Sequence, residues 1–184
     1  MNKNEETATL AGGCFWCTEA VFQRLKGVLS VTSGYSGDGK INPTYDEVST
    51  GKSGYIESVQ IEFDPEIISF SQILDVFWNT HDPTTVDRQG NDVGPQYKSA
   101  IFYRNRKQKD AAEKSKKELG KEGVYKNPAV TKILPFAKFY PAEKYHVRFY
   151  ENNPSSMYCN LVITPKVDKL YGNFGDKIKK EYLR

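Results

Sequence analysis

The chain has 184 residues, and its 26 Lys and Arg against 23 Asp and Glu give a formal net charge of +3, too small to indicate nucleic-acid binding by charge alone. Its 38% hydrophobic and 13% aromatic residues exclude a disordered chain and predict one domain over residues 1–184, with loosely packed ends at 1–6 and 167–184. No apolar run approaches the ~18 residues needed to span a bilayer, so we expect a soluble, cytoplasmic protein with no membrane partner.

The N-terminal part of the chain predicts a strand followed by a helix. Residues 7–13, TATLAGG, alternate like a short strand and end in glycines. The next apolar residues recur at helical spacing as far as Gly27, which predicts a helix over 14–26. Cys14 would then lie at the N-terminus of this helix.

The middle of the chain predicts two strands, a second helix and a long loop. Residues 28–37 and 55–63 have strand composition, and turn-rich sequence separates them. Apolar residues at helical spacing, after serines able to cap, predict a helix over 69–82. Residues 81–96 hold almost no apolar side chain and predict a loop of a length that usually has a function.

The remaining elements complete the predicted fold. We expect a strand over 99–104, a charged helix over 105–121 with a solvated face, and a strand around 129–136. The resulting order β-α-β-β-α-β-α-β predicts an α+β two-layer sandwich, with helices packed against a mixed sheet, as a ferredoxin-like variant.

Two of the three cysteines form a C-x-x-C motif, Cys14 and Cys17. In a reducing compartment this motif indicates redox or metal chemistry, and a helix N-terminus favours the reactive thiolate of Cys14. The plainer alternative is a pair of buried apolar thiols. Zinc would need four ligands, and Cys159, His81 and His146 supply no second close pair, so we predict no metal site.

Four ordered segments carry a resemblance to a known family: GCFWCTE, TYDEVSTGKSGYIESVQIEFDP, HDPTTVDRQGNDVGPQYKSAIFY and EKYHVRFYENNP. Together they resemble the A-type peptide methionine sulfoxide reductases, which reduce the S-epimer of methionine sulfoxide. The match runs from about residue 7 to about residue 166. It is therefore far more specific than a lone C-x-x-C motif.

The resemblance implies roles for the residues around the first cysteine. Cys14 corresponds to the nucleophile that attacks the sulfoxide sulfur. Phe15 and Trp16 match the aromatic wall for the S-methyl group of the substrate. Glu57 matches the acid that hydrogen-bonds the sulfoxide oxygen and donates a proton as the S–O bond weakens.

Four further residues match the family in the same way. Tyr45 and Tyr97 correspond to tyrosines that help to hold the sulfoxide oxygen, and Asp92 corresponds to a second acid of the pocket. His146 matches a family histidine, to which we assign no role.

General chemistry agrees with these assignments. A sulfoxide oxygen leaves only when it is protonated, which a neutral carboxylic acid in an apolar pocket provides near pH 7. Taken alone, an acid beside a strand, such as Glu57, is more often simply solvated. Two tyrosine hydroxyls can stabilise charge developing on the oxygen.

Attack leaves a sulfenic acid on Cys14, which condenses with a neighbouring thiol to a disulfide. The commoner family pattern has Gly at the position of Cys17 and resolves the sulfenic acid with cysteines of the C-terminal tail. This chain offers two resolving candidates, Cys17 and Cys159, and we favour Cys17 because it needs no movement of the tail. A thioredoxin-type protein is expected to reduce the disulfide.

We therefore predict a monomeric repair enzyme against oxidative stress, acting on oxidised proteins and on free methionine sulfoxide, with no bound cofactor and no nucleic-acid partner. One alternative is a general dithiol–disulfide oxidoreductase that uses the C-x-x-C motif but does not need an acid and two tyrosines. A second is a non-enzymatic binding module, for example for nucleic acid, built on the basic helix around 104–121 and the aromatic tail. Its binding would persist in Cys14→Ser and weaken steeply with salt.

Overall fold

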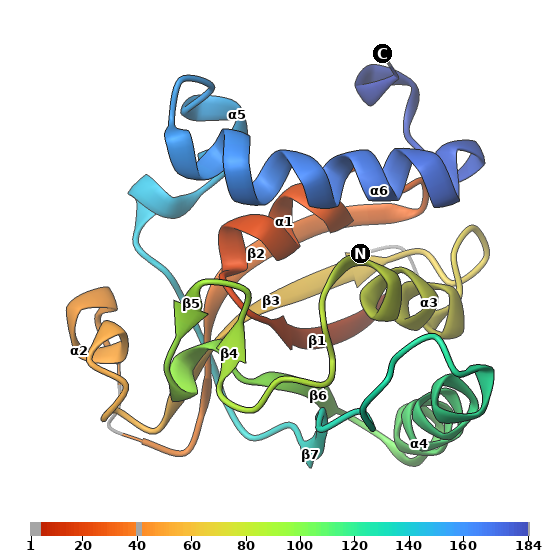
Figure 1. The fold of residues 1–184 in the computed structure, drawn as a ribbon, viewed down its shortest axis with the longest axis horizontal. Coiled ribbons are helices and arrows are strands. Elements are labelled where there is room, and N and C mark those ends of the chain that lie inside the picture. The colour runs from red at the N-terminus through yellow and green to blue at the C-terminus, as the bar shows by residue number, and fades with distance from the viewer. Residues whose placement is uncertain (1–4, 40–41, 184) are drawn as a thin grey trace.

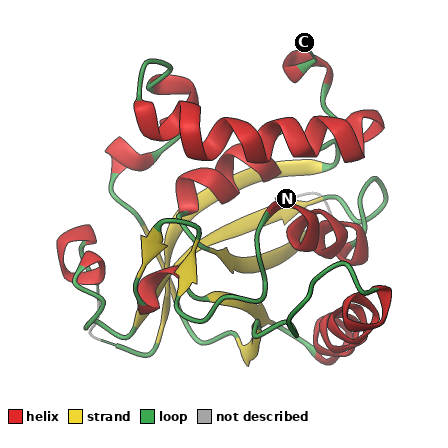
Figure 2. Cartoon of the chain, in the orientation of Figure 1, coloured by secondary structure: helices red, strands yellow, loops and turns green. Residues whose placement is uncertain are grey.

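The chain folds around a mixed six-stranded sheet (Figures 1 and 2). This computed structural model describes residues 5–39 and 42–183. The strand order is β7-β6-β1-β3-β2-β8, in which β6 and β7 are parallel and every other neighbouring pair is antiparallel. The strands of this sheet are β1 (Glu6–Gly12), β2 (Val28–Gly37), β3 (Tyr55–Phe63), β6 (Ser99–Tyr103), β7 (Lys132–Pro135) and β8 (Phe139–Pro141).

The helices of the chain differ in length and in burial. Two are single turns, α2 (Tyr45–Ser49) and α5 (Phe149–Asn152). The longer helices are α1 (Phe15–Phe22), α3 (Phe70–Thr80), α4 (Arg106–Glu122) and α6 (Thr164–Phe174). A capping box formed by Ser69 and Gln72 starts α3 and satisfies backbone N–H groups that its first turn leaves free.

Strand periodicity sets which side chains of β3 face the helices. Val59, Ile61 and Phe63 belong to the main core, whereas Ile56 packs with a smaller cluster on the opposite face of the sheet. Side chains two apart in a strand share a face. Glu57 therefore points into the main core, in line with three apolar side chains.

Helix α1 packs on the sheet, and α6 covers the outer side of α1 (Figure 1). Every side chain of α1 except Trp16 is buried. A short helix with so little exposed surface is held by tertiary packing rather than by its own helix propensity. The first turn of α1 is consequently held in place by its neighbours and largely excluded from solvent.

The architecture confirms the predicted mixed sheet with packed helices, and several elements differ in detail. Helix α1 ends at Phe22, whereas the sequence predicts a helix as far as residue 26. The predicted loop over 81–96 contains a two-stranded hairpin, β4 (Arg88–Gln89) and β5 (Asp92–Val93), and leads into a 3-10 turn. Strands of two residues, such as β4 and β5, are too short to show the alternation of apolar and polar side chains that predicts a strand.

The C-terminal segment differs most from the sequence-based expectation. For 167–184 we expect loose packing, yet the side chains of Val167, Leu170 and Ile178 are buried. Of the N-terminal end, 1–6, residues 1–4 lie outside the described part of the chain. The segment after α5 enters α6 through a π-helical turn, Cys159–Ile163.

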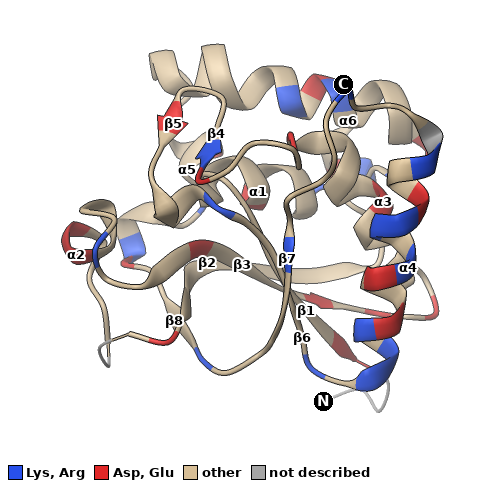
Figure 3. Cartoon of the chain, turned by 60° about the horizontal axis from the view of Figure 1, so that its bottom comes forward, with Lys and Arg blue, Asp and Glu red and all other residues tan. Residues whose placement is uncertain are grey.

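Charge along α4 is mixed rather than uniformly basic, as blue and red segments alternate along that helix (Figure 3). Lys109–Glu113 and Lys114–Glu118 are ion pairs one turn apart. Such pairs are typical of a solvated helix face. Within the described residues no helix is both long enough and apolar enough to cross a bilayer.

Candidate active site

The first turn of α1 presents Cys14 at the end of strand β1. The strand ends at Gly12, and Gly13 then adopts a positive φ of 89°, which turns the chain into the helix. Cys14 precedes the first helical residue, and its carbonyl accepts the backbone N–H of Cys17 at 3.1 Å. Its side chain is 6% exposed. The thiol thus lies at the helix N-terminus predicted for it.

Glu57 completes the N-terminus of α1 from the neighbouring strand β3. Its Oε2 accepts the backbone N–H of Phe15 at 3.0 Å, and its side chain also hydrogen-bonds Cys14. The residue is only 1% exposed. Burial raises the pKa of the Glu57 carboxyl to about 8, against the opposing effect of the Phe15 N–H. The carboxyl is therefore mostly protonated at neutral pH and beside the thiol, rather than solvated.

The two thiols of the C-x-x-C motif interact directly. All three cysteines are free, and Cys14 and Cys17 share a side-chain hydrogen bond. Burial raises the pKa of the Cys14 thiol, whereas the hydrogen bond from Cys14 lowers the pKa of the Cys17 thiol to about 7. The first negative charge of the pair consequently resides on Cys17, with Cys14 donating to it.

Cys159 lies in the same apolar core as the other two cysteines. It begins the π-helical turn before α6, and its carbonyl accepts the Thr164 hydroxyl at 3.0 Å. Its side chain is fully buried, and burial raises the pKa of its thiol. Cys159 is thus less ready than Cys17 to ionise at neutral pH.

Aromatic side chains surround the start of α1. Trp16 stacks on Phe149 of α5 with ring centroids 3.6 Å apart and an interplanar angle of 5°. Its indole Nε1 donates to Nδ1 of His146 at 3.0 Å. On the other side, Phe15 is buried and stacks on Tyr45 at 6.4 Å between centroids. Both residues predicted to form the apolar wall therefore lie beside Cys14.

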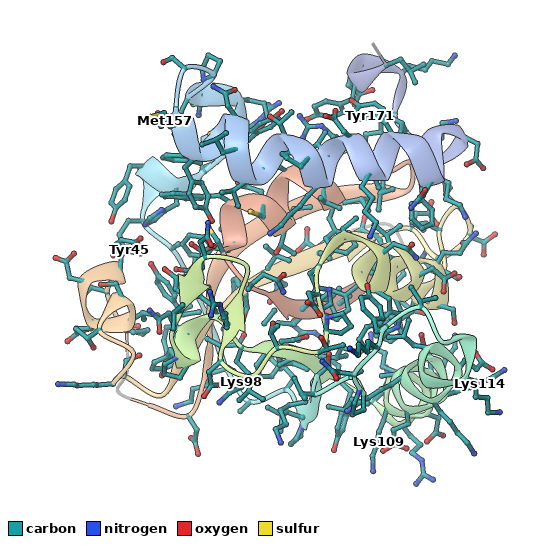
Figure 4. All side chains as sticks on the ribbon, in the orientation of Figure 1. Tyr45, Lys98, Lys109, Lys114, Met157 and Tyr171 are labelled. Atoms are coloured by element: carbon teal, nitrogen blue, oxygen red, sulfur yellow. The ribbon has the colours of Figure 1, made fainter. Side chains whose placement is uncertain are left out.

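The two predicted tyrosines approach the same point from separate segments. Tyr45 begins α2, where Figure 4 labels it, and its backbone N–H donates to Glu143 at 2.8 Å. Tyr97 ends the 3-10 turn Pro95–Tyr97. Burial, followed by the charge of Glu57, raises the pKa of Tyr45 to about 12 and that of Tyr97 further. Both hydroxyls thus remain donors throughout the neutral range.

Asp92 joins the site through a tyrosine that our sequence analysis did not identify. The Tyr158 hydroxyl donates to Oδ2 of Asp92 at 2.7 Å and lies 3.9 Å from Sγ of Cys17. Burial, followed by the charges of the two active-site thiols, raises the pKa of Tyr158 strongly. Its position next to Cys159 in the sequence was the available signal. Only the folded chain brings it to β5.

His146 has a defined tautomer, because the Trp16 indole can only donate. Nδ1 is therefore the acceptor and Nε2 carries the proton. Burial lowers the pKa of this ring, so it is neutral at pH 7. Nε2 lies 3.8 Å from Glu143 Oε2 and has no hydrogen-bond partner among the described residues. The ring thus orients the indole of Trp16 as a neutral acceptor.

His81, the other histidine, lies outside this cluster. It follows α3 and its ring hydrogen-bonds the Phe77 carbonyl at 2.6 Å and the Ser99 hydroxyl at 2.8 Å. Burial lowers its pKa to about 4, so it caps the helix as a neutral ring. In the described part of the chain, no group of three His, Cys, Asp or Glu side chains is arranged to hold a metal ion.

The arrangement therefore combines a thiol, a neutral carboxylic acid and tyrosine hydroxyls with an aromatic wall. Such a site can protonate a poorly leaving oxygen while a sulfur nucleophile attacks the atom that carries it. It also holds a second thiol in hydrogen-bond contact with the first. A general disulfide exchanger would need neither the buried acid nor the tyrosines.

Comparison with known proteins agrees with this chemistry. The family model described as "Peptide methionine sulfoxide reductase" matches residues 6–178. "Peptide methionine sulfoxide reductase MsrA 1" of Rhodopirellula baltica is 54% identical over 176 residues, which cover 95% of this chain and 90% of that protein. "Peptide methionine sulfoxide reductase MsrA" of Sulfolobus acidocaldarius is 52% identical, with 94% and 97% covered.

Solved structures have the same fold. Mxr1 from Saccharomyces cerevisiae in reduced form superposes with a TM-score of 0.79 and 29% identity, covering 86% of this chain and 91% of that one. The same yeast protein in complex with Trx2 gives a TM-score of 0.55 and 24% identity, covering 81% and 87%.

Proposed function

The chain belongs to the peptide methionine sulfoxide reductase family, and from that premise we propose how its residues divide the reaction. It reduces methionine sulfoxide to methionine. Its substrates are the S-epimer of the sulfoxide in oxidised proteins and in the free amino acid. The observation that carries the assignment is the Glu57 carboxyl, which is buried at the start of α1 and accepts the N–H of Phe15, the residue next to Cys14.

In the first step the sulfur of Cys14 attacks the sulfoxide sulfur. Glu57 protonates the sulfoxide oxygen, and the oxygen passes from the substrate sulfur to the Cys14 sulfur as the bond between the two sulfurs breaks. Cys14 is thereby oxidised by two electrons to a sulfenic acid, and the substrate is reduced by two electrons to methionine. In the resting pair Cys14 is the protonated thiol, and the Cys17 sulfur is placed to take its proton during attack. The buried position of Glu57 supports its role as the acid, because burial keeps it protonated near pH 7.

The substrate is held by groups on both sides of the reacting bond. Tyr45 and Tyr97 donate to the oxygen, whose developing charge they stabilise. Phe15 and Trp16 form the apolar wall for the methyl group, where an aromatic face favours a sulfur that gains positive character. Asp92 acts through Tyr158, whose hydroxyl donates a hydrogen bond to Oδ2 of Asp92 at 2.7 Å.

In the second step Cys17 resolves the sulfenic acid to a disulfide with Cys14. Its place one helical turn from Cys14 and the lowered pKa of its thiol favour it over Cys159, whose thiol has a raised pKa. A dithiol protein of the thioredoxin class then reduces the disulfide by thiol–disulfide exchange. The complex of yeast Mxr1 with Trx2 is in keeping with this choice.

The test is incubation of the reduced protein with separated R and S sulfoxide epimers of a methionine peptide, followed by mass mapping of the disulfide. We expect consumption of the S-epimer alone and a Cys14–Cys17 disulfide. Cys14→Ser should abolish methionine formation with dithiothreitol as reductant. Untouched epimers together with reduction of a protein disulfide would instead favour a general dithiol–disulfide oxidoreductase.

We further propose a monomeric, cytoplasmic repair enzyme consisting of a single domain. Three free cysteines suit a reducing compartment. A ferredoxin-like origin of the fold is supported by the run β1-α1-β2-β3-α3-β6, whose strands lie in the antiparallel order β6-β1-β3-β2. Sedimentation at micromolar concentration tests the oligomeric state, and a dimer would contradict that part of the proposal.

A further inference from the structure

The Cys17 side chain has a second set of neighbours, in a pocket whose lining includes none of the residues assigned to the substrate. A narrow pocket between α1, α3 and the first turn of α6 is lined by Cys17, Thr18, Thr80, His81 and Lys166. Lys166 and Cys17 both line this pocket, and, after the hydrogen bond from Cys14, the positive charge of Lys166 lowers the pKa of the Cys17 thiol. Lys166 of α6 is therefore a cationic neighbour of the Cys17 thiol.

Lys166 is the positive charge near Cys17, because the other titratable groups named below are neutral or negative at pH 7. His81 shares the pocket but is a neutral ring at pH 7, because burial lowers its pKa to about 4. Cys14 is a hydrogen-bond partner of Cys17, and the Tyr158 hydroxyl, which donates to Asp92, lies 3.9 Å from the Cys17 sulfur. Glu57 and Cys159 also interact electrostatically with Cys17, and neither supplies positive charge.

Lys166 is half-buried in α6, which continues directly from the π-helical turn Cys159–Ile163. Its side chain shares the lining of the pocket with Cys17. An ammonium next to a thiol favours the thiolate, which is the species that attacks other sulfur atoms.

We propose that Lys166 is a positioning residue for the second step, which holds negative charge on the Cys17 sulfur so that this thiolate attacks the Cys14 sulfenic acid. The inference rests on the proposed function. The bond between the two cysteine sulfurs forms as the S–O bond of the sulfenic acid breaks. The proton that Cys17 took from Cys14 in the first step returns to the Glu57 carboxylate. The oxygen leaves with the bonding pair and takes that proton from Glu57, which gives water and a two-electron-oxidised cysteine pair.

The test compares Lys166→Met, which keeps the side-chain length, with Lys166→Arg, which keeps the charge. Lys169→Met is the matched control, because it removes a charge from the same helix outside the lining of the pocket. Each reduced protein receives one equivalent of an S-sulfoxide peptide between pH 5.5 and 9.5. Acid quenching and mass spectrometry then follow methionine and the Cys14–Cys17 disulfide separately.

Lys166→Met should still form one equivalent of methionine, but the pH midpoint of disulfide formation should rise by about one unit above the midpoint measured for the wild-type protein. The rate should be about two- to threefold lower at pH 6 and equal or higher above pH 9, because a more basic thiolate is also the better nucleophile. Lys166→Arg and Lys169→Met should follow the wild-type profile.

An unchanged midpoint in Lys166→Met, or an equal shift in Lys169→Met, would overturn the inference, and so would a wild-type disulfide between Cys14 and Cys159. If Lys166→Met does not fold, Lys166→Gln provides the same measurement. Failure of the wild-type protein to form methionine would contradict the proposed function instead, so the two failures are distinguishable.

Discussion

Glu57 has two tasks within one carboxyl group. It accepts the first free N–H of α1 at 3.0 Å, which the helix cannot satisfy itself, and it carries a proton beside Cys14. The same burial serves both tasks, because it excludes water from the helix end and keeps the carboxyl neutral.

The exchange Glu57→Gln separates these tasks, because the amide oxygen can still accept the Phe15 N–H while the proton donor is lost. We expect the rate of methionine formation to fall by roughly 10²-fold or more. Wild-type activity should decline above pH about 8 as the carboxyl ionises, and this alkaline limb should be missing in the variant. A kcat profile over pH 6–10 measures both effects. Near-wild-type kinetics would show that Glu57 is not the proton donor and has a structural role only.

The same exchange should stabilise the fold. The raised pKa means that the unfolded carboxyl ionises above about pH 4.3 while the folded one stays protonated up to about 8, so wild-type stability falls with pH across this window. Glu57→Gln removes this cost, which should be on the order of 3 kcal/mol at pH 7 and near zero at pH 4. Urea unfolding at both pH values provides the measurement.

At the scale of elements, the site depends on how β1 passes into α1. Gly13 has a φ of 89°, and a Cβ there would lie 2.5 Å from the side chain of Gln89. Gln89 cannot move freely, because its amide bonds the backbone N–H and carbonyl of Asp82, both at 3.0 Å. The position of the nucleophile is therefore coupled to the β4–β5 hairpin.

We expect Gly13→Ala to cost about 2–4 kcal/mol of unfolding free energy, from backbone strain and displacement of Gln89, and to lower activity through misplacement of Cys14. Gly90→Ala is the control, since Gly90 also has a positive φ, of 61°, but a Cβ at that position would meet nothing within 4 Å. Its cost should be about 1 kcal/mol with normal activity. Equal effects of the two substitutions on activity would show that the contact with Gln89 does not matter.

At the scale of the whole molecule, the C-terminal segment closes the core over α1. Leu170 of α6 is fully buried, and the chain beyond it returns to the end of α1. There Lys26 N–H donates to the Lys177 carbonyl and Lys179 N–H to the Arg24 carbonyl, both at 2.8 Å. This segment and the sheet should therefore unfold together.

Leu170→Ala should remove about 2–5 kcal/mol of unfolding free energy, because it leaves a cavity between α6 and the rest of the core. Circular dichroism and tryptophan fluorescence should report one coincident transition at a lower urea midpoint. Lys169→Ala, an exposed exchange on the same helix, should change the midpoint little. A separate early transition for the variant would indicate that α6 folds independently.

The sequence by itself determined the strands with regular alternation and the helices with a clear apolar face. The predicted strands over 28–37 and 55–63 coincide with β2 and β3, and the helix over 69–82 contains α3. The local signals for Cys14 were also sufficient, because a glycine pair followed by helical spacing fixes a helix start. These features depend on neighbours in the chain.

Only the tertiary structure decided what surrounds that thiol. Glu57 is 42 residues from Phe15, and Tyr158 is 66 residues from Asp92 and 141 from Cys17, so no local pattern could pair them. Whether an acid in a strand is solvated or protonated depends on the layers packed over it, here α1 and α6. The chemistry of the site therefore follows from burial, which the sheet order and helix packing set together.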